Sequence, residues 1–73
     1  MDREILLRHL AQAEQHVAEG KAHIAKQQRM IVEFERDGHD ATEAVCLLET
    51  FVLLQQSREE HRARILDELS ESS

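Results

Sequence analysis

The chain has 73 residues, a formal net charge of −6, no proline and two aromatic residues, Phe34 and Phe51. This length allows a single domain, and the scarcity of turn-forming and aromatic residues argues against a β-rich fold. The acidic balance argues against a protein that coats nucleic acid or an anionic membrane surface, because both roles need clustered lysine and arginine.

A heptad pattern runs through the first half of the chain. With Leu10 at an a position, the a residues are Arg3, Leu10, Val17, Ile24 and Ile31, and the d residues are Leu6, Ala13, Gly20, Gln27 and Phe34. This pattern is typical of a helix that packs along its length against other helices. It predicts one helix over residues 3–36, with the weakest packing positions at Gly20 and Gln27.

A turn is expected at residues 37–40. Gly38 can adopt the left-handed conformation that ends a helix. Asp40 can accept hydrogen bonds from the first N–H groups of the next helix, and Glu43 stands at the capping-box position three residues later. Because so short a connection allows only an antiparallel arrangement, the sequence predicts a helical hairpin with an all-α fold.

The second helix is expected over residues 41–69, followed by a disordered tail at residues 70–73. The pattern places Arg58 opposite Gly20, where the aliphatic stem of the arginine can cover the missing side chain. The line predicted to face the first helix is Ala44, Leu47, Phe51, Leu54, Arg58, His61 and Ile65, with Leu48, Val52, Gln55, Arg62, Leu66 and Leu69 beside it.

The apolar stripe of the second helix is wider than one partner helix can cover. A lone two-helix hairpin also has little core to offset chain entropy. The sequence therefore favours a homodimer of hairpins that forms a four-helix bundle. Another helical protein bound along the same stripe is the alternative. The residues expected at this interface are Ile24, Ile31, Val45, Leu48, Phe51 and Val52.

Three histidines repeat at seven-residue spacing, His9, His16 and His23, on the g positions beside the packing line. Seven residues of helix rise by about 10.5 Å, so no two of these residues can share a metal ion on one helix. His16 could approach His61 across the hairpin. A structural role is expected for the histidines, while a metal-responsive or pH-sensitive contact stays open.

Neither catalysis nor cofactor binding is expected. The chain has no glycine-rich phosphate loop, no serine elbow and no Cys-x-x-Cys pair, and no histidine is predicted beside Cys46. Cys46 is interpreted as a small apolar residue at the packed start of the second helix. The expected function is a small non-enzymatic interaction or regulatory module.

The runner-up function is binding of nucleic acid, RNA in particular, along the outward side of the first helix. The residues that would form this face are Arg8, Lys26, Arg29 and Arg36. Acidic residues are interleaved with them, and no aromatic side chain stands on that face to stack on a base. Nucleic acid is accordingly the less favoured partner.

The phrase Glu35-Arg36-Asp37-Gly38-His39-Asp40 resembles the turn of a group of short uncharacterised bacterial helical-hairpin proteins. The likeness continues in the surrounding helices, at residues 9–10, 13–14, 16–20, 23–24, 31, 47–48 and 51. This group has no established activity, so the resemblance implies no function. Val45 and Cys46 stand where polar residues are expected in such proteins, which makes the stripe of this chain more apolar.

The expected compartment is the cytoplasm. The N-terminal residues lack the basic and apolar regions of a secretory signal, and the apolar run at residues 45–48 is far shorter than a membrane span of roughly 20 residues. Cys46 is the single cysteine, so it has no intrachain disulfide partner. A reducing setting without a membrane is therefore expected.

Overall fold

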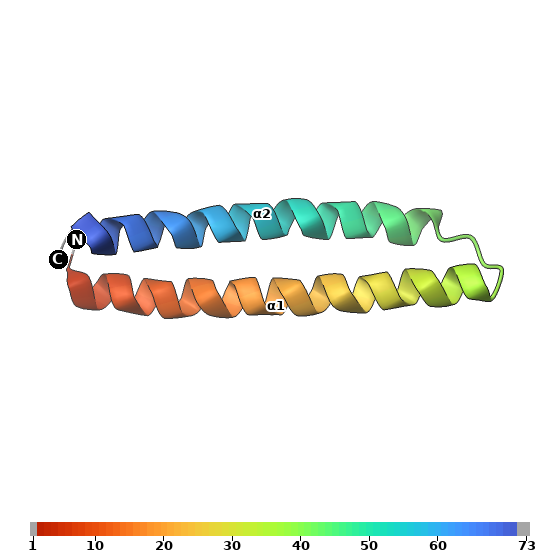
Figure 1. The fold of residues 1–73 in the computed structure, drawn as a ribbon, viewed down its shortest axis with the longest axis horizontal. Helices are drawn as coiled ribbons and strands as arrows, with labels where there is room; N and C mark the ends of the chain where they lie inside the picture. Colours follow the sequence, from red (N-terminus) through yellow and green to blue (C-terminus); the bar gives the residue numbers. More distant parts are fainter. Residues whose placement is uncertain (1, 72–73) are drawn as a thin grey trace.

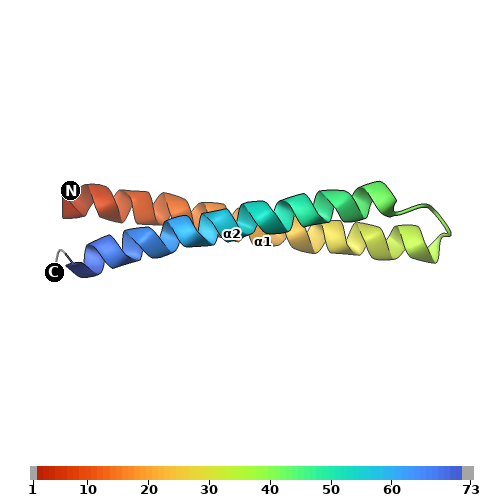
Figure 2. The same cartoon turned by 90° about the horizontal axis from the view of Figure 1, so that it is seen from above.

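The computed structural model describes residues 2–71, which form two helices joined by one turn (Figure 1). Helix α1 spans Arg3–Arg36 and helix α2 spans Thr42–Glu71. The helices lie side by side in opposite directions, and the start of α1 and the end of α2 meet at one end of a rod (Figure 1). Seen from above, they cross at a shallow angle (Figure 2). The predicted all-α hairpin is confirmed.

The end of α1 is defined by Gly38, whose φ of 76° is the left-handed conformation predicted for this position. The N–H of His39 donates to the carbonyl of Phe34 at 2.8 Å, and the N–H of Gly38 donates to the carbonyl of Glu35 at 3.2 Å. These two bonds form a Schellman motif, which satisfies carbonyl groups that the helix itself leaves free. The bounds of α1 coincide with the predicted residues 3–36.

The start of α2 is stabilised by Asp40, as the sequence predicted, although the helix begins one residue later than expected. Oδ1 of Asp40 accepts the N–H of Thr42 at 3.0 Å and the hydroxyl of Thr42 at 2.6 Å. Both hydrogen bonds lower the pKa of the Asp40 carboxyl. The bond from the Thr42 hydroxyl has the larger effect, and the bond from the Thr42 backbone N–H has the smaller one.

The end of α2 differs from the sequence prediction. The helix continues to Glu71, so Ser70 and Glu71 are helical rather than part of a disordered tail. Residues 72–73 of the predicted tail lie outside the described residues.

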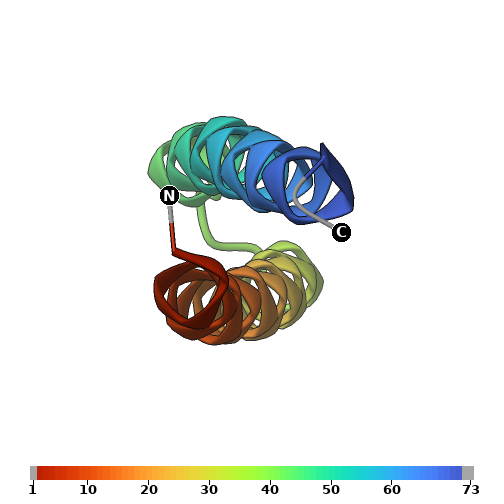
Figure 3. The ribbon, with the colours of Figure 1, turned by 90° about the vertical axis from the view of Figure 1, so that its left-hand side faces the viewer.

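The predicted heptad positions of α1 face α2. The residues of α1 that are buried are Leu6, Ala13, Val17, Gly20, Gln27 and Ile31, all of which occupy a or d positions. Viewed along the rod, the two helices lie beside each other in a single layer (Figure 3). Their buried residues form one packing line between them. We call this line the seam.

The seam side of α2 was predicted only in part. Its buried and half-buried residues after the turn are Ala44, Leu48, Phe51, Gln55, Arg58, Arg62, Ile65 and Leu69. Leu47 and Leu54 are instead 45% and 48% exposed, and His61 is exposed as well. The prediction was therefore wrong by one position at Leu47, Leu54 and His61. The next residue along the chain faces α1 in each case.

The end of α2 supplies a physical reason for this difference. Leu69 is 8% exposed and belongs to an apolar cluster with Leu6, Ala13 and Ile65. Continued by one step, the predicted line would place Glu68 in the seam instead of Leu69. Burial of an unpaired carboxylate costs far more than burial of a leucine, so the helix faces α1 with the Leu69 side.

Two buried glutamines connect the helices through backbone carbonyl groups. Nε2 of Gln27, which is 5% exposed, donates to the carbonyl oxygen of Ala44 at 2.9 Å. Nε2 of Gln55, which is 7% exposed, donates to the carbonyl oxygen of Val17 at 2.8 Å. Each bond joins residues far apart in sequence, so together they favour one alignment of the two helices over alignments shifted along the seam.

Candidate interaction surface

The hairpin exposes more surface than a globular protein of its mass. Its accessible surface is 5508 Å², whereas a folded monomer of 8.5 kDa is expected to expose about 4,700 Å². The radius of gyration is 16.7 Å, against about 11 Å for a compact chain of this length. The excess of about 800 Å² equals the share that one partner contributes to a standard protein–protein interface.

Much of this exposed surface is apolar. The large apolar side chains exposed among the described residues are Ile5, Leu7, Val32, Val45, Leu47, Val52, Leu53, Leu54 and Leu66. Scattered exposed leucines are ordinary on protein surfaces. Here, however, most of these side chains follow the heptad positions that flank the seam, so they form lines along the rod.

Exposed and half-buried side chains flank the seam on both sides of the hairpin. With Leu48 and Gln55 counted as a positions of α2, one side lies at e and b positions of α1 and e positions of α2. We call the following residues of that side the alanine face: Leu7, Ala11, Ala18, Ala25, Val32, Val45, Val52 and Leu66. The other side consists of g positions, and we call it the histidine face: His9, His16, His23, Met30, Leu47, Leu54 and His61.

We call the end of the rod opposite the turn, where α1 starts and α2 ends, the open end. The alanine face extends over most of the rod, from Leu7 near the open end to Val32 near the turn. Val32 is 64% exposed, and Leu7 and Leu66 are 46% and 44% exposed. Between them, α1 presents alanines at seven-residue spacing. Small side chains at a contact let two helix axes approach to the short end of the usual 8–10 Å range. This face is therefore shaped to receive another helix.

The histidine face is apolar only in the half of the rod near the turn. The rings of His23 and Phe51 lie 6.1 Å apart between their centroids. These two residues border a shallow depression with Lys26, Gln27 and Met30. Towards the open end, the g positions of the face become polar. The apolar part of this face is consequently shorter than the alanine face.

The predicted His16–His61 pair stays a prediction, with both side chains exposed at g positions. Within residues 2–71 no group of three or more histidine, cysteine or acidic side chains lies close enough to hold a metal ion. Cys46 is exposed, so its interpretation as a packed residue was wrong. It occupies an f position on the outer side of α2.

Four of the six residues predicted at a dimer interface contribute to the seam within one hairpin. Ile31 is buried, and Ile24, Leu48 and Phe51 are half-buried between the helices. The other two, Val45 and Val52, are 38% and 39% exposed on the alanine face. Their positions make them the predicted interface residues that a second protein can contact without opening the hairpin.

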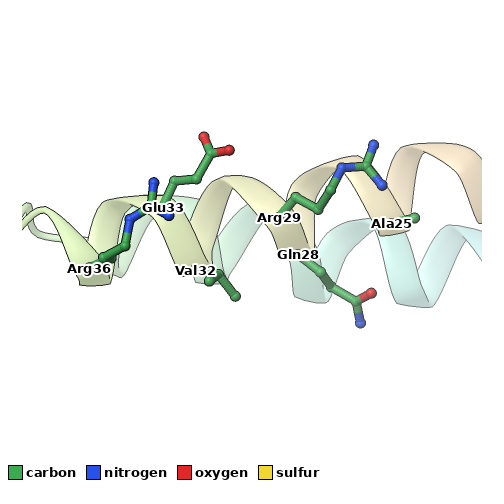
Figure 4. Close-up of a pocket in the computed structure, with 6 residues that line it drawn as sticks. All are labelled: Ala25, Gln28, Arg29, Val32, Glu33 and Arg36. Carbon is green, nitrogen blue, oxygen red and sulfur yellow. The ribbon is translucent and has the colours of Figure 1, made fainter.

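Basic residues of the outward side of α1 are interrupted by carboxylates. Arg29 and Arg36 border a shallow depression with Glu33, and Arg29 and Glu33 project from the same side of the helix (Figure 4). Arg36 also approaches the carboxylate of Asp37 at 3.7 Å, and Arg8 approaches that of Glu4 at 4.0 Å. Lys26 borders a neighbouring depression with Arg29 and Glu33. Phosphate groups would meet a surface of mixed charge here.

Comparison of the chain with protein-family models, curated proteins and solved structures found no match. Neither helix within residues 2–71 has a stretch long and apolar enough to cross a membrane.

The sequence contains a signal for the alanine face in a heptad line separate from that of the seam. Ala11, Ala18, Ala25 and Val32 repeat at seven-residue spacing, one position after the a residues. A second heptad line on the same helix indicates a second contact surface. The signal is weak by itself because alanine has the highest helix propensity and is therefore ordinary on a solvated helix surface as well.

Proposed function

We propose that this hairpin is a small non-enzymatic interaction or regulatory module that pairs with a second copy of itself in the cytoplasm. The observation that carries the proposal is the surface of about 800 Å² that the hairpin exposes beyond the expectation for its mass. Large apolar side chains are exposed along much of the rod. A partner is the usual way to remove such a surface from water.

The energetics of a two-helix hairpin support the same proposal. Its apolar core within residues 2–71 includes a cluster of only Leu6, Ala13, Ile65 and Leu69, with Leu10 packed against it. Two buried glutamines and a glycine interrupt the rest of the seam. Chains of this size commonly need a further source of stability, and oligomerisation is one of them.

The proposal is tested by measuring the molar mass of the purified chain by sedimentation equilibrium over a range of concentrations. We expect twice the monomer mass of 8.5 kDa. Val52→Glu places a charge on the alanine face, so it is expected to give a folded monomer or a much weaker dimer. Leu53→Glu is the matched control, because Leu53 is 65% exposed on the outer side of α2.

Circular dichroism of both variants separates loss of the dimer from loss of the fold. A wild-type chain that stays at the monomer mass up to high micromolar concentration contradicts the proposal. So does a Val52→Glu variant that remains helical and dimerises as tightly as the wild type.

A further inference from the structure

We infer that the second copy covers the alanine face and runs antiparallel to the first, so that the two turns lie at opposite ends of a four-helix bundle. This inference rests on the proposed dimer and adds its interface and its alignment. The order of charged and apolar residues along the face supports this alignment.

Charged residues form a belt across the middle of the alanine face. Glu14 and Lys21 occupy e positions of α1. Glu59 occupies an e position of α2, four residues or about 6 Å beyond Gln55, whose Nε2 bonds the carbonyl of Val17, so it stands at about the level of Glu14. All three residues are exposed. Ala18 lies between Glu14 and Lys21. The acidic part of the belt therefore lies on the open-end side of Ala18, and the basic part lies on the turn side.

The alignment of two copies decides how these charges meet. With a twofold axis along the rod, each residue lies at the same level as its own copy, so Glu14 comes to the level of Glu14 and Glu59, and Lys21 to the level of Lys21. With a twofold axis perpendicular to the rod at Ala18, Glu14 and Glu59 approach Lys21 of the second copy. The opposed Glu14 and Lys21 side chains then differ in their position along the rod by less than about 2 Å. Opposite charges across an interface favour the second arrangement and disfavour the first.

Apolar residues at the two ends of the face agree with the same axis. Leu7 stands about 16 Å from Ala18 towards the open end. Val45 follows Ala44, whose carbonyl bonds Gln27, so Val45 stands roughly 14 Å from Ala18 towards the turn. The perpendicular axis therefore brings Leu7 of one copy against Val45 of the other, and Leu66 near Val32. The charged belt and these two apolar contacts are complementary to themselves in this alignment.

Disulfide cross-linking of single-cysteine variants tests this alignment. In a Cys46→Ser background, one cysteine is placed at Ala11, Ala18 or Ala25, three positions on the same line. A disulfide needs Cα atoms within about 7 Å. We expect Ala18→Cys to cross-link with itself under mild oxidation. Ala11→Cys and Ala25→Cys should cross-link only when the two variants are mixed.

Each other outcome overturns a defined part of the inference. Self-cross-linking of all three variants overturns the antiparallel alignment, because only an axis along the rod brings each residue to its own copy. Cross-linking of Leu54→Cys in place of Ala18→Cys overturns the choice of face but leaves the proposed dimer intact. A wild-type chain that sediments as a monomer overturns the proposed function itself, and the alignment with it.

Discussion

The carboxamide of Gln55 lies over Gly20, in space that a side chain at position 20 would occupy. A Cβ built on Gly20 would stand 2.7 Å from Cδ of Gln55 and 2.9 Å from Nη1 of Arg58. Arg58 thus covers Gly20 as the sequence predicted, but Gln55 comes closer. The glycine allows Gln55 to stay within the seam while its Nε2 bonds the carbonyl of Val17.

Replacing Gly20 by alanine tests this relationship. Alanine is favoured over glycine inside a helix by about 1 kcal/mol. Its methyl group displaces the buried Gln55 amide, which costs the bond to Val17 and leaves a buried polar group unpaired, together about 2 kcal/mol. We expect Gly20→Ala to unfold with a Tm lower by about 5 °C, measured by circular dichroism at fixed protein concentration.

The control for this variant is the same substitution in a Gln55→Ala background. With the carboxamide gone, the methyl group at position 20 meets less crowding, and the helix preference of alanine should dominate. We expect the Tm to rise in this background. A fall of equal size in both backgrounds would show that Gln55 is not the cause.

The buried glutamines are expected to determine alignment rather than stability. Leucine at positions 27 and 55 removes two hydrogen bonds worth about 1 kcal/mol each and gains apolar burial of at least that size. We expect the Gln27→Leu/Gln55→Leu variant to unfold at a higher denaturant concentration than the wild type. Its molar mass should become heterogeneous because shifted alignments of the helices are no longer disfavoured. A stable variant with one sharp mass contradicts this role.

The hydrogen bonds to Asp40 should make the free energy of unfolding depend on pH in the acidic range. Hydrogen bonds from Thr42 lower the pKa of Asp40 in the folded chain below the ordinary value of 3.8. The stabilisation is therefore fully present above about pH 5, and it is lost as the pH falls through the lowered pKa of the folded state. Asp40→Asn keeps a capping oxygen that does not titrate. The difference in stability between wild type and Asp40→Asn should change below about pH 5 and stay constant above it.

The apolar cluster at the open end should be the part of the seam most sensitive to truncation. Ile65 is 4% exposed within it, so Ile65→Ala is expected to destabilise the chain by about 3 kcal/mol. Leu53→Ala removes a side chain of similar size from an exposed position and should cost less than about 0.5 kcal/mol. Urea unfolding followed by circular dichroism measures both values. Equal losses would show that the cluster is not the core.

The basic residues of α1 are expected not to hold RNA, in keeping with the carboxylates placed among them. The chain purified under native conditions should carry no RNA. Its mobility in a gel-shift assay with mixed-sequence RNA should not change at 150 mM salt. Binding that weakens steeply with salt and is lost in Arg29→Ala would support the nucleic-acid function instead.

The sequence alone determined the hairpin, because the signals involved are local. Heptad spacing identified the side of α1 that packs, and the conformational freedom of Gly38 together with the carboxylate of Asp40 marked the turn. Each of these properties depends on a few neighbouring residues, so no tertiary contact was needed to read them.

Only the tertiary structure decided which side of α2 faces α1. Leu47 and Leu48 are equally apolar, and so neither can be preferred from its own chemistry. The choice depends on distant residues, namely the space above Gly20 that accepts Gln55 and the cluster around Leu6 that accepts Leu69. That choice turns Val45 and Val52 outward beside the alanines of α1. The surface proposed for the second copy therefore follows from packing between the helices, which the pattern of one helix does not contain.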